Sequence, residues 1–422
     1  MDFLQKLKLV WNDASLRKRL LFIAVMLVAF RLLSSIPIPS IDILKLQSFL
    51  ADNQFFGLLN IFSGGGLSNL SIVMLGVGPY ITASIIMQLL TMMSPRLKAM
   101  YQEDGEAGRA KFAQYSRLLS VPLALVQAFS FLIILSRSGV VTDLAFFSTL
   151  VNVIIITAGS LLVMWIGELM TEYGIGNGTS LIIFAGIVAS LPSAISQLVF
   201  VFDPSDVPMY LGFLVLAVLI VWGVVVVTEA ERPIPVTYAK RVRGMKVYGG
   251  VSTYLPLRVN QAGVIPIIFA LSIMLFPQMI ASVLSVASNS ILQTISSLLT
   301  VVFSNQWVYG VLYFVLVFLF TYFYTAVTFD PETISTNLQK NGAFIPGVRP
   351  GASTSEHIAS VVTRITLVGA VFLAFVAILP LVMQGITGNQ TLAIGGTALL
   401  IVVSVVLDFI KKIDAQISMR EY

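Results

Sequence analysis

Continuous apolar blocks of about 20 residues, nearly free of charge, are the feature that most limits what this chain can fold into. A helix of that length crosses a bilayer, whereas the strands of a transmembrane β-barrel alternate over about ten residues. Only 11% of the 422 residues are charged, against about 25% in soluble proteins. The sequence therefore predicts an all-α polytopic membrane protein.

Ten spanning helices are expected, joined by loops of two contrasting compositions. The spans are expected at residues 19–36, 73–93, 118–137, 151–171, 179–198, 209–228, 262–284, 306–328, 360–384 and 391–410. All Lys and Arg residues except Arg31, Lys45 and Arg137 lie in the N-terminus, in alternate loops or in the C-terminal tail. Because cytoplasmic loops are enriched in Lys and Arg, both termini and the long loops are expected in the cytoplasm. The opposite loops, such as 285–305, are nearly uncharged.

The chain divides into an N-terminal half, 1–203, and a C-terminal half, 204–422, with five expected spans each. Because each half has an odd number of spans, the two halves insert with opposite topology. Halves related in this way often surround a mid-membrane pathway. Residues 1–19 are basic and amphipathic, as in a helix that lies on an anionic membrane surface. A cleaved signal peptide is disfavoured, because the following apolar run contains Arg31 and ends in IPIP instead of small residues.

The stretch 61–92 is apolar but is interrupted in its first half by five glycines and by Pro79. Three consecutive glycines weaken a helix by roughly 2–3 kcal/mol. We expect a short, loosely held segment at about 61–72, a break near 76–79, and a firm spanning helix that ends at about Met93. Irregular backbone survives at membrane depth only where protein buries it or a cavity solvates it, so a cavity is expected here. An external loop that leads into an ordinary helix is the alternative.

Groups for acid–base or metal chemistry are scarce. His357 is the only histidine, cysteine is absent, and no cluster of His, Asp and Glu has the spacing of a metal site. We therefore expect no catalytic residues, no metal and no cofactor. The centres of the spans also carry few ionisable groups, unlike those of ion-coupled transporters. A hydrophobic constriction gates by dewetting and needs no such groups.

Five separated motifs resemble the SecY family, the main channel subunit of the bacterial Sec protein translocase, and the resemblance covers essentially the whole chain. The motifs are SIVMLGVGPYITASIIMQL at 71–89, WIGELMTEYGIGNGTSLII at 165–183, ERPIPVTYAKR at 231–241, LPLRVNQAGVIPIIFA at 255–270 and GAFIPGVRPG at 342–351. The resemblance implies a clamshell of two five-helix halves around a central pore in the bacterial cytoplasmic membrane. It implies a non-enzymatic channel that translocates unfolded secretory polypeptides and releases membrane proteins sideways into lipid.

By the same resemblance, a plug helix before the second span closes the outer funnel, and isoleucines form a ring in the pore. The plug residues are Ser63, Gly64, Gly65, Gly66, Leu67, Ser68 and Asn69. The ring residues are Ile81, Ile85, Ile183, Ile187, Ile268 and Ile401. Small plug residues suit a narrow vestibule, and the two i, i+4 isoleucine pairs each share a helix face.

The resemblance also implies a lateral gate between spans two and three on one side and spans seven and eight on the other. Gln88, Gln127 and Asn260 are candidates for a polar latch there, although each could equally be an ordinary interhelical amide. Arg241, Arg243, Lys246 and Arg349, on the long cytoplasmic loops 229–261 and 329–358, are candidate partner-binding residues. The first three could instead serve only as a topology signal.

The partners implied are the SecE and SecG subunits, the SecA motor ATPase, the ribosome with its rRNA phosphates, signal peptides, nascent polypeptides and membrane lipid. The alternative function is a ten-span secondary transporter for a small solute. Such a transporter needs charged or coordinating groups at mid-depth, and the sequence offers few. A membrane-embedded enzyme is a more distant alternative, because acid–base residues are missing.

Overall fold

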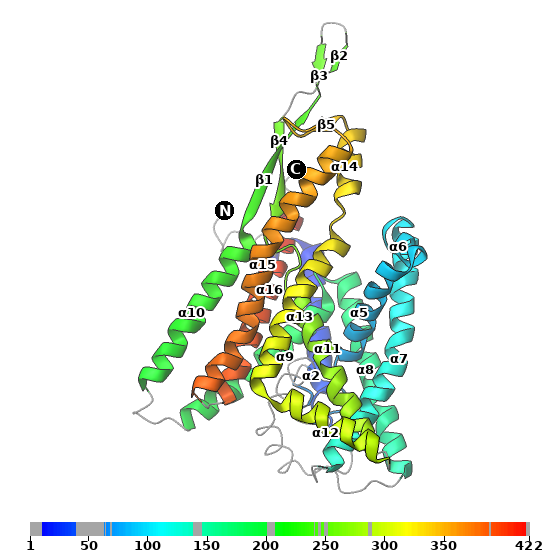
Figure 1. Ribbon diagram of the computed structural model, residues 1–422, viewed down its shortest axis with the longest axis vertical. Helices are drawn as coiled ribbons and strands as arrows, with labels where there is room; N and C mark the ends of the chain where they lie inside the picture. The colour runs from blue at the N-terminus through cyan, green and yellow to red at the C-terminus, as the bar shows by residue number, and fades with distance from the viewer. Residues whose placement is uncertain are drawn as a thin grey trace.

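The computed structural model describes residues 11–38, 63, 65–67, 70–137, 146–200, 207–239, 241–243, 246–248, 252–285, 289–387 and 390–418. Most of this chain is helical, and the long helices run side by side as a bundle (Figure 1). The first six are α2 (Ala14–Leu33), α5 (Gly78–Met93), α6 (Pro95–Gln102), α7 (Gly105–Arg137), α8 (Phe146–Tyr173) and α9 (Gly178–Phe200). The others are α10 (Val207–Glu229), α11 (Ile265–Leu284), α12 (Ser290–Ser304), α13 (Gln306–Thr328), α14 (Pro331–Lys340), α15 (Ala352–Thr387) and α16 (Gln390–Ser418).

Each expected span overlaps one helix of the described chain. The helix expected to end at about Met93 after a break near 76–79 is α5, which starts at Gly78 with Pro79 in its first turn. Within the described ranges, four helices are long and apolar enough to cross a membrane: Gly105–Ser136, Phe146–Tyr173, Gln306–Lys340 and Ala352–Met383. Shorter apolar helices include Gly78–Met93, Gly178–Pro192, Leu214–Glu229 and Ile265–Ala281. The full set of ten spans therefore stays a prediction.

Two small sheets correct the expectation of an all-α chain. Strands β1 (Glu231–Tyr238), β4 (Ser252–Arg258) and β5 (Ala343–Phe344) form an antiparallel sheet in the order β4-β1-β5. Strands β2 (Arg241–Arg243) and β3 (Lys246–Tyr248) form a separate hairpin. In β1, Pro233 and Pro235 disfavour a helix, while Ile234 and Val236 alternate with exposed residues and face the core. The sheet joins the two long loops, because β1 pairs with both β4 and β5.

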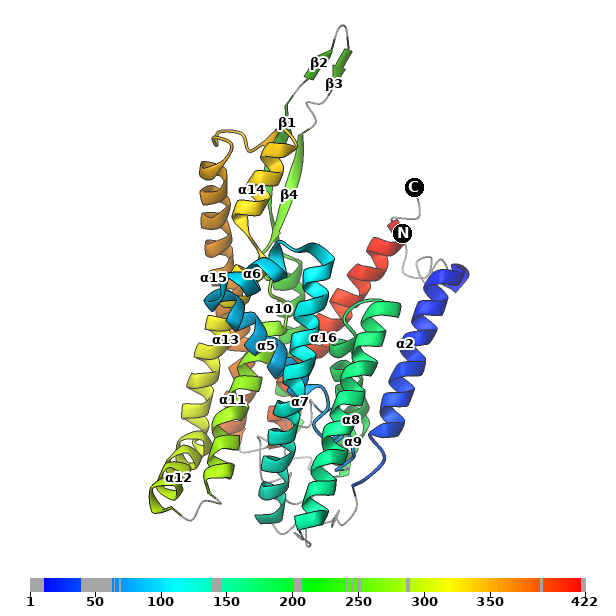
Figure 2. The same cartoon turned by 90° about the vertical axis from the view of Figure 1, so that its right-hand side faces the viewer.

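The sheet packs at one end of the bundle. Ile234 and Val236 of β1 lie in an apolar cluster with Ile345 and with Ile358 and Val362 of α15. Figure 2 shows the sheet, the start of α2 and the end of α16 at the same end of the molecule. The hairpin β2–β3 extends furthest beyond the bundle (Figure 1). We call this the sheet end of the molecule.

Helix α12 replaces part of the expected loop 285–305 at the opposite end of the bundle, where it lies across the helix ends (Figures 1 and 2). Its first turn is capped by the Asn289 side chain, which accepts a hydrogen bond from the Ile291 amide at 2.9 Å. The Ser296 hydroxyl donates to the Ala281 carbonyl of α11 at 2.7 Å. The loop expectation rested on low charge and overlooked the helical spacing of apolar residues such as Ile291, Ile295 and Leu298.

Two apolar clusters fill the bundle. The larger contains buried side chains from α5, α8, α9, α11, α13, α15 and α16. The smaller joins the chain before α5 to α7 and α8. The larger cluster thus draws side chains from both sides of residue 203, while the division into two halves at that residue stays a prediction.

Candidate functional site

The chain before α5 is an irregular segment, the glycine-rich segment, described here at residues 63, 65–67 and 70–77. Its described residues form turns and one bridge, Pro37 to Ser71, instead of the expected helix. The Ile38 amide donates to the Leu70 carbonyl and the Ile72 amide to the Ile36 carbonyl, at 2.9 and 3.0 Å. These bonds tie the segment to the chain that leaves α2.

The expectation of a loosely held segment is wrong for the described residues. Ser63, Leu67 and Leu70 are fully buried. The Leu67 amide donates to Ser63 Oγ at 3.0 Å, and Ser71 Oγ donates to the Gly66 carbonyl at 3.0 Å. Glycine weakens helical structure, but hydrogen bonds and burial stabilise this segment in a non-helical conformation. Composition alone does not reveal these contacts. Gly64, Ser68 and Asn69, the other expected plug residues, lie outside the described chain.

Helix α8 holds the segment through a glycine and a serine. A Cβ atom on Gly159 would lie 2.0 Å from the Ile72 carbonyl oxygen, so only glycine permits this approach. The neighbouring Ser160 donates its hydroxyl to the Gly76 carbonyl at 2.8 Å. Gly76 itself has φ +53°, a left-handed conformation that suits glycine. Sequence reasoning missed both α8 residues, because nothing local marks a glycine in an apolar helix as a contact.

Arg31 also reaches the segment. A Cβ atom built on Gly65, which has φ +83°, would lie 3.2 Å from Arg31 Nη1 and 3.9 Å from the Gly186 carbonyl of α9. Sequence reasoning assigned Arg31 no role in the interior. Its guanidinium in fact lies against the backbone of the glycine-rich segment.

All six isoleucines of the expected ring belong to the larger apolar cluster. They come from four helices: Ile81 and Ile85 from α5, Ile183 and Ile187 from α9, Ile268 from α11 and Ile401 from α16. Ile81 is partly buried, and the others are at most 8% exposed. The same cluster includes Val73 and Val77 of the glycine-rich segment, so the segment continues into this apolar group.

The three candidate gate amides do not form one latch. Gln88 Nε2 donates to Ser84 Oγ at 3.3 Å on its own helix, and Asn260 Nδ2 donates to the Gly263 carbonyl at 3.3 Å. Gln127 is buried on α7. No hydrogen bond links any two of these amides in the described structure, and Gln88 Oε1 and Asn260 Oδ1 are buried without a partner. Asn260 lies against Gly369 of α15, which sequence order alone does not indicate.

A different amide bridges the helices that flank the expected gate. Helix α11 packs against both α5 and α7. On the sheet side of this contact, Gln102 of α6 donates to the Val327 carbonyl of α13 at 3.4 Å. Gln102 follows the second expected span and Val327 ends the eighth. Sequence reasoning missed Gln102, because it lies in a polar loop where an amide carries no signal.

The candidate partner-binding residues all lie on the sheet end. Arg241 and Arg243 belong to β2 and Lys246 to β3, with Arg243 opposite Lys246 in the hairpin. Arg349 is exposed in the turn between β5 and α15. Its carbonyl accepts a hydrogen bond from Thr354 Oγ1 at 2.9 Å, and Gly347 and Gly351 on either side have φ +82° and +105°. This backbone holds the turn that presents Arg349 to solvent.

The described residues contain no group of three or more His, Cys, Asp or Glu that could hold a metal ion. His357 is exposed on α15. The strongest feature of the interior is therefore the larger apolar cluster, which contains the six isoleucines, with a buried, irregular segment beside it. Such a site can be dry when closed and wet when its side chains separate, but it offers no group for acid–base chemistry.

Comparison with known proteins finds extensive similarity. The SecY family model matches residues 71–410. The protein translocase subunit SecY of Streptomyces coelicolor is 42% identical over 429 residues, which cover 98% of this chain and 97% of that protein. The Corynebacterium glutamicum protein of the same name is 42% identical over 435 residues, with 98% and 97% covered.

Two solved structures share the fold at 20% identity, each covering 94% of this chain and 91% of its own. One is a SecY protein whose plug domain is described as stabilising the closed state of the translocation channel and maintaining a membrane seal, with a TM-score of 0.64. The other is Sec61 in the canine ribosome-channel complex from the endoplasmic reticulum, with a TM-score of 0.60.

Proposed function

Since this chain belongs to the SecY family of protein translocation channels, we propose that its isoleucine ring and glycine-rich segment form the closed passage for the polypeptide. The observation that supports the proposal is that the six isoleucines, from α5, α9, α11 and α16, all lie in or against the larger apolar cluster. Branched apolar side chains exclude water and ions when they touch, and they separate when a chain passes. The glycine-rich segment acts as the plug on one side of this ring.

The proposed orientation places the sheet end in the cytoplasm. The basic residues of the long loops support it, because cytoplasmic loops are enriched in Lys and Arg. The ten expected spans then cross the bacterial cytoplasmic membrane, with both termini in the cytoplasm. The N-terminal and C-terminal halves meet at the ring with opposite topology.

The lateral gate is proposed between α5 and α7 on one side and α11 and α13 on the other. Opening there would release apolar segments sideways into lipid. Gln102 and the Val327 carbonyl supply one polar link across this boundary, at 3.4 Å. A single neutral hydrogen bond of this kind contributes only about 0.5–1.5 kcal/mol. Such a link biases the gate toward closure without locking it.

The proposed partners bind at two places. The ribosome, through its rRNA phosphates, and the SecA motor ATPase are proposed to dock on the sheet end through Arg241, Arg243, Lys246 and Arg349. Lys and Arg bind phosphates with a strong dependence on salt. SecE and SecG are proposed to pack on the membrane faces of the helices, while signal peptides, nascent polypeptides and lipid meet at the gate.

Crosslinking from the ring tests the proposed passage. A photoreactive amino acid placed at Ile81 or Ile187 is expected to crosslink a secretory chain stalled during translocation, because both positions belong to the ring. The same amino acid at Val188, which is on the exposed side of α9, is the matched control. Crosslinks from both ring positions and none from Val188 support the passage. Silence at both ring positions, with the stalled chain verified, rejects the ring assignment and favours a small-solute pathway.

Arg349 is expected to act in partner docking more than in folding. Charge reversal by Arg349→Glu keeps the exposed turn but removes its guanidinium, so SecA-driven translocation should fall by about tenfold, as for loss of one charged contact worth about 1.4 kcal/mol. The rate of translocation into inverted vesicles measures it, and the thermal stability of the purified protein should change little. Arg232→Glu, near the start of β1 and also exposed, is the control. Equal rates for Arg349→Glu and the unmodified protein would remove Arg349 from the docking surface.

A further inference from the structure

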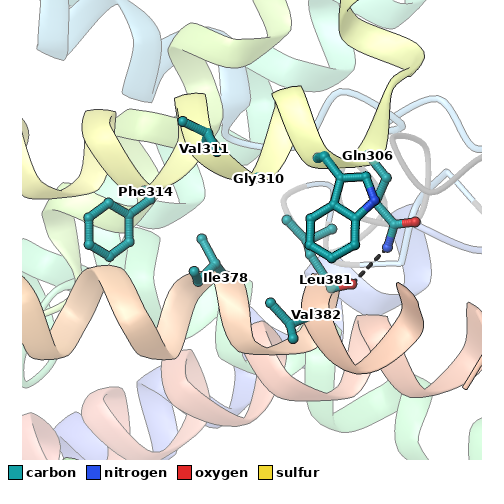
Figure 3. Close-up of a pocket in the computed structure, with 8 residues that line it drawn as sticks. Gln306, Gly310, Val311, Phe314, Ile378, Leu381 and Val382 are labelled. Carbon is teal, nitrogen blue, oxygen red and sulfur yellow. Dashed lines mark hydrogen bonds between the residues drawn. The ribbon is translucent and has the colours of Figure 1, made fainter. Parts of the chain in front are cut away.

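An apolar groove lies between α13 and α15, outside the ring and the gate. It has a volume of about 200 Å³ and is lined by Gln306, Trp307, Gly310, Val311, Phe314, Ile378, Leu381 and Val382. Figure 3 shows the side chains of Phe314 and Ile378 between the two helices, with Val311 on the outer side of α13. Gly310 leaves room on the α13 side, since a Cβ atom there would approach only Leu381 Cδ1, at 3.9 Å. We propose that this groove binds the acyl chain of a membrane phospholipid.

The groove opens onto the exposed apolar surface of α13 and α15, which faces hydrocarbon if these helices span the membrane as proposed. Val311 and Val315 of α13 are 64% and 44% exposed, and Phe375 of α15 is 57% exposed. Both helices belong to the long apolar set that can cross a membrane. A gap open to the bilayer and lined by apolar side chains is filled by hydrocarbon, because empty space forfeits dispersion contacts and water finds no partners there.

The polar groups lie at one end of the groove. Gln306, the first residue of α13, donates its Nε2 to the Leu381 carbonyl at 2.7 Å (Figure 3). Trp307 is 68% exposed, and tryptophan is enriched at the membrane interface. From Gln306 to Phe314 the helix rises about 12 Å into the bilayer. The groove therefore runs from the interface toward the hydrocarbon centre, as a lipid tail does.

The position of helix α12 also indicates that the polar end of the groove lies at the membrane interface. It precedes α13 directly and lies across the bundle, and its residues Ile291, Leu298 and Val301 are at least 60% exposed. An amphipathic helix with such a face lies in the plane of the interface. The start of α13, and hence the polar end of the groove, is then at headgroup level. Under the proposed orientation this is the leaflet opposite the cytoplasm.

The size of the groove favours a lipid tail over a transmembrane helix of a partner. A helix with side chains is about 10 Å wide, so 200 Å³ would hold less than two residues of it. The same volume equals roughly seven groups of the size of a water molecule, at about 30 Å³ each. A methylene is of similar size, so a short stretch of acyl chain fits.

Photolabelling of the intact translocase complex in vesicles tests the proposal. The vesicles consist of phosphatidylethanolamine and phosphatidylglycerol with a trace of phosphatidylcholine that carries a diazirine in its acyl chain. Mass spectrometry of the peptides should find more lipid adducts on Val311, Phe314 and Ile378 than on Leu214 and Val218, which are exposed on α10. Equal labelling of the two sets would overturn the proposal.

Variants that fill the groove with a larger side chain, and matched variants that do not, test the same proposal. Gly310→Leu should reduce groove adducts by about tenfold, the factor expected when two methylenes lose their burial. Gly310→Ala, which the 3.9 Å clearance accommodates, should keep them. Gly212→Leu on α10, where a Cβ atom meets nothing within 4 Å, is the control for an added leucine. A photoreactive amino acid at Val311 that captures a polypeptide instead of lipid would show that a partner helix occupies the groove.

Discussion

Replacing Gly159 with valine is expected to leave the resting channel open to ions. A Cβ atom at this position would lie 2.0 Å from the Ile72 carbonyl oxygen, so the glycine-rich segment has to move off α8. Overpacking of this kind costs about 3 kcal/mol, which corresponds to roughly a hundredfold shift of the closed state toward the displaced state. Conductance of the reconstituted complex in a planar bilayer, without a translocating chain, measures the leak.

Ala158→Val is the matched control, because Ala158 is exposed on the same helix one residue earlier. It should leave the channel as tight as the unmodified protein. Ser160→Ala removes only the hydrogen bond to the Gly76 carbonyl and should give a smaller leak, since one such bond contributes about 1 kcal/mol. A Gly159→Val channel that folds and stays as tight as Ala158→Val would show that this contact does not hold the seal.

The second large effect is expected when two residues of the proposed ring are replaced by polar residues, which should make the channel leak ions. Ile183 and Ile187 are both nearly inaccessible on one face of α9. Changing both to serine removes most of the apolar surface that, under the proposed function, keeps this part of the ring dry. Full burial of each isoleucine is worth about 1.5–3 kcal/mol, so replacing both should move the balance between dry and wet states by about two to four orders of magnitude. Ion leakage from vesicles should rise accordingly.

Val188→Ser with Leu191→Ser supplies the control on the same helix. Both residues are exposed, at 39% and 45%, and they point away from the ring. This pair removes a similar amount of apolar surface without touching the ring, so leakage should stay at its resting level. Equal leakage from the two double variants would mean that serine on α9 destabilises the helix in general, and the ring would lose its support.

The positions of the apolar helices were largely readable from the sequence, because the length of an apolar block and the effect of proline are local properties, while their crossing of a membrane as ten spans stays a prediction. Pro79 marked the start of α5, and Met93 its end. The ends of longer helices were less accurate. Helix α15 starts at Ala352, eight residues before the expected span, because a helix can continue beyond the part that hydropathy detects.

The family and its channel function also followed from the sequence, through motifs that lie within the matched range 71–410. The six isoleucines were named from those motifs, and the structure brings them into one cluster. The gate amides were chosen by residue type and by their place near the spans that the resemblance assigns to the gate. Amide chemistry does not specify a partner, and the structure gives Gln88 and Asn260 local partners instead of each other.

The sequence by itself determined that the chain is a bundle of apolar helices with a glycine-rich interruption before α5, since backbone preference and hydrophobic length act over a few residues. The tertiary structure alone decided that β1 pairs with β5 across more than a hundred residues of chain. It also decided that Gly159 receives the Ile72 carbonyl, and that α13 and α15 leave a groove between them. These features depend on which surfaces meet, and that is set by the packing of the whole chain.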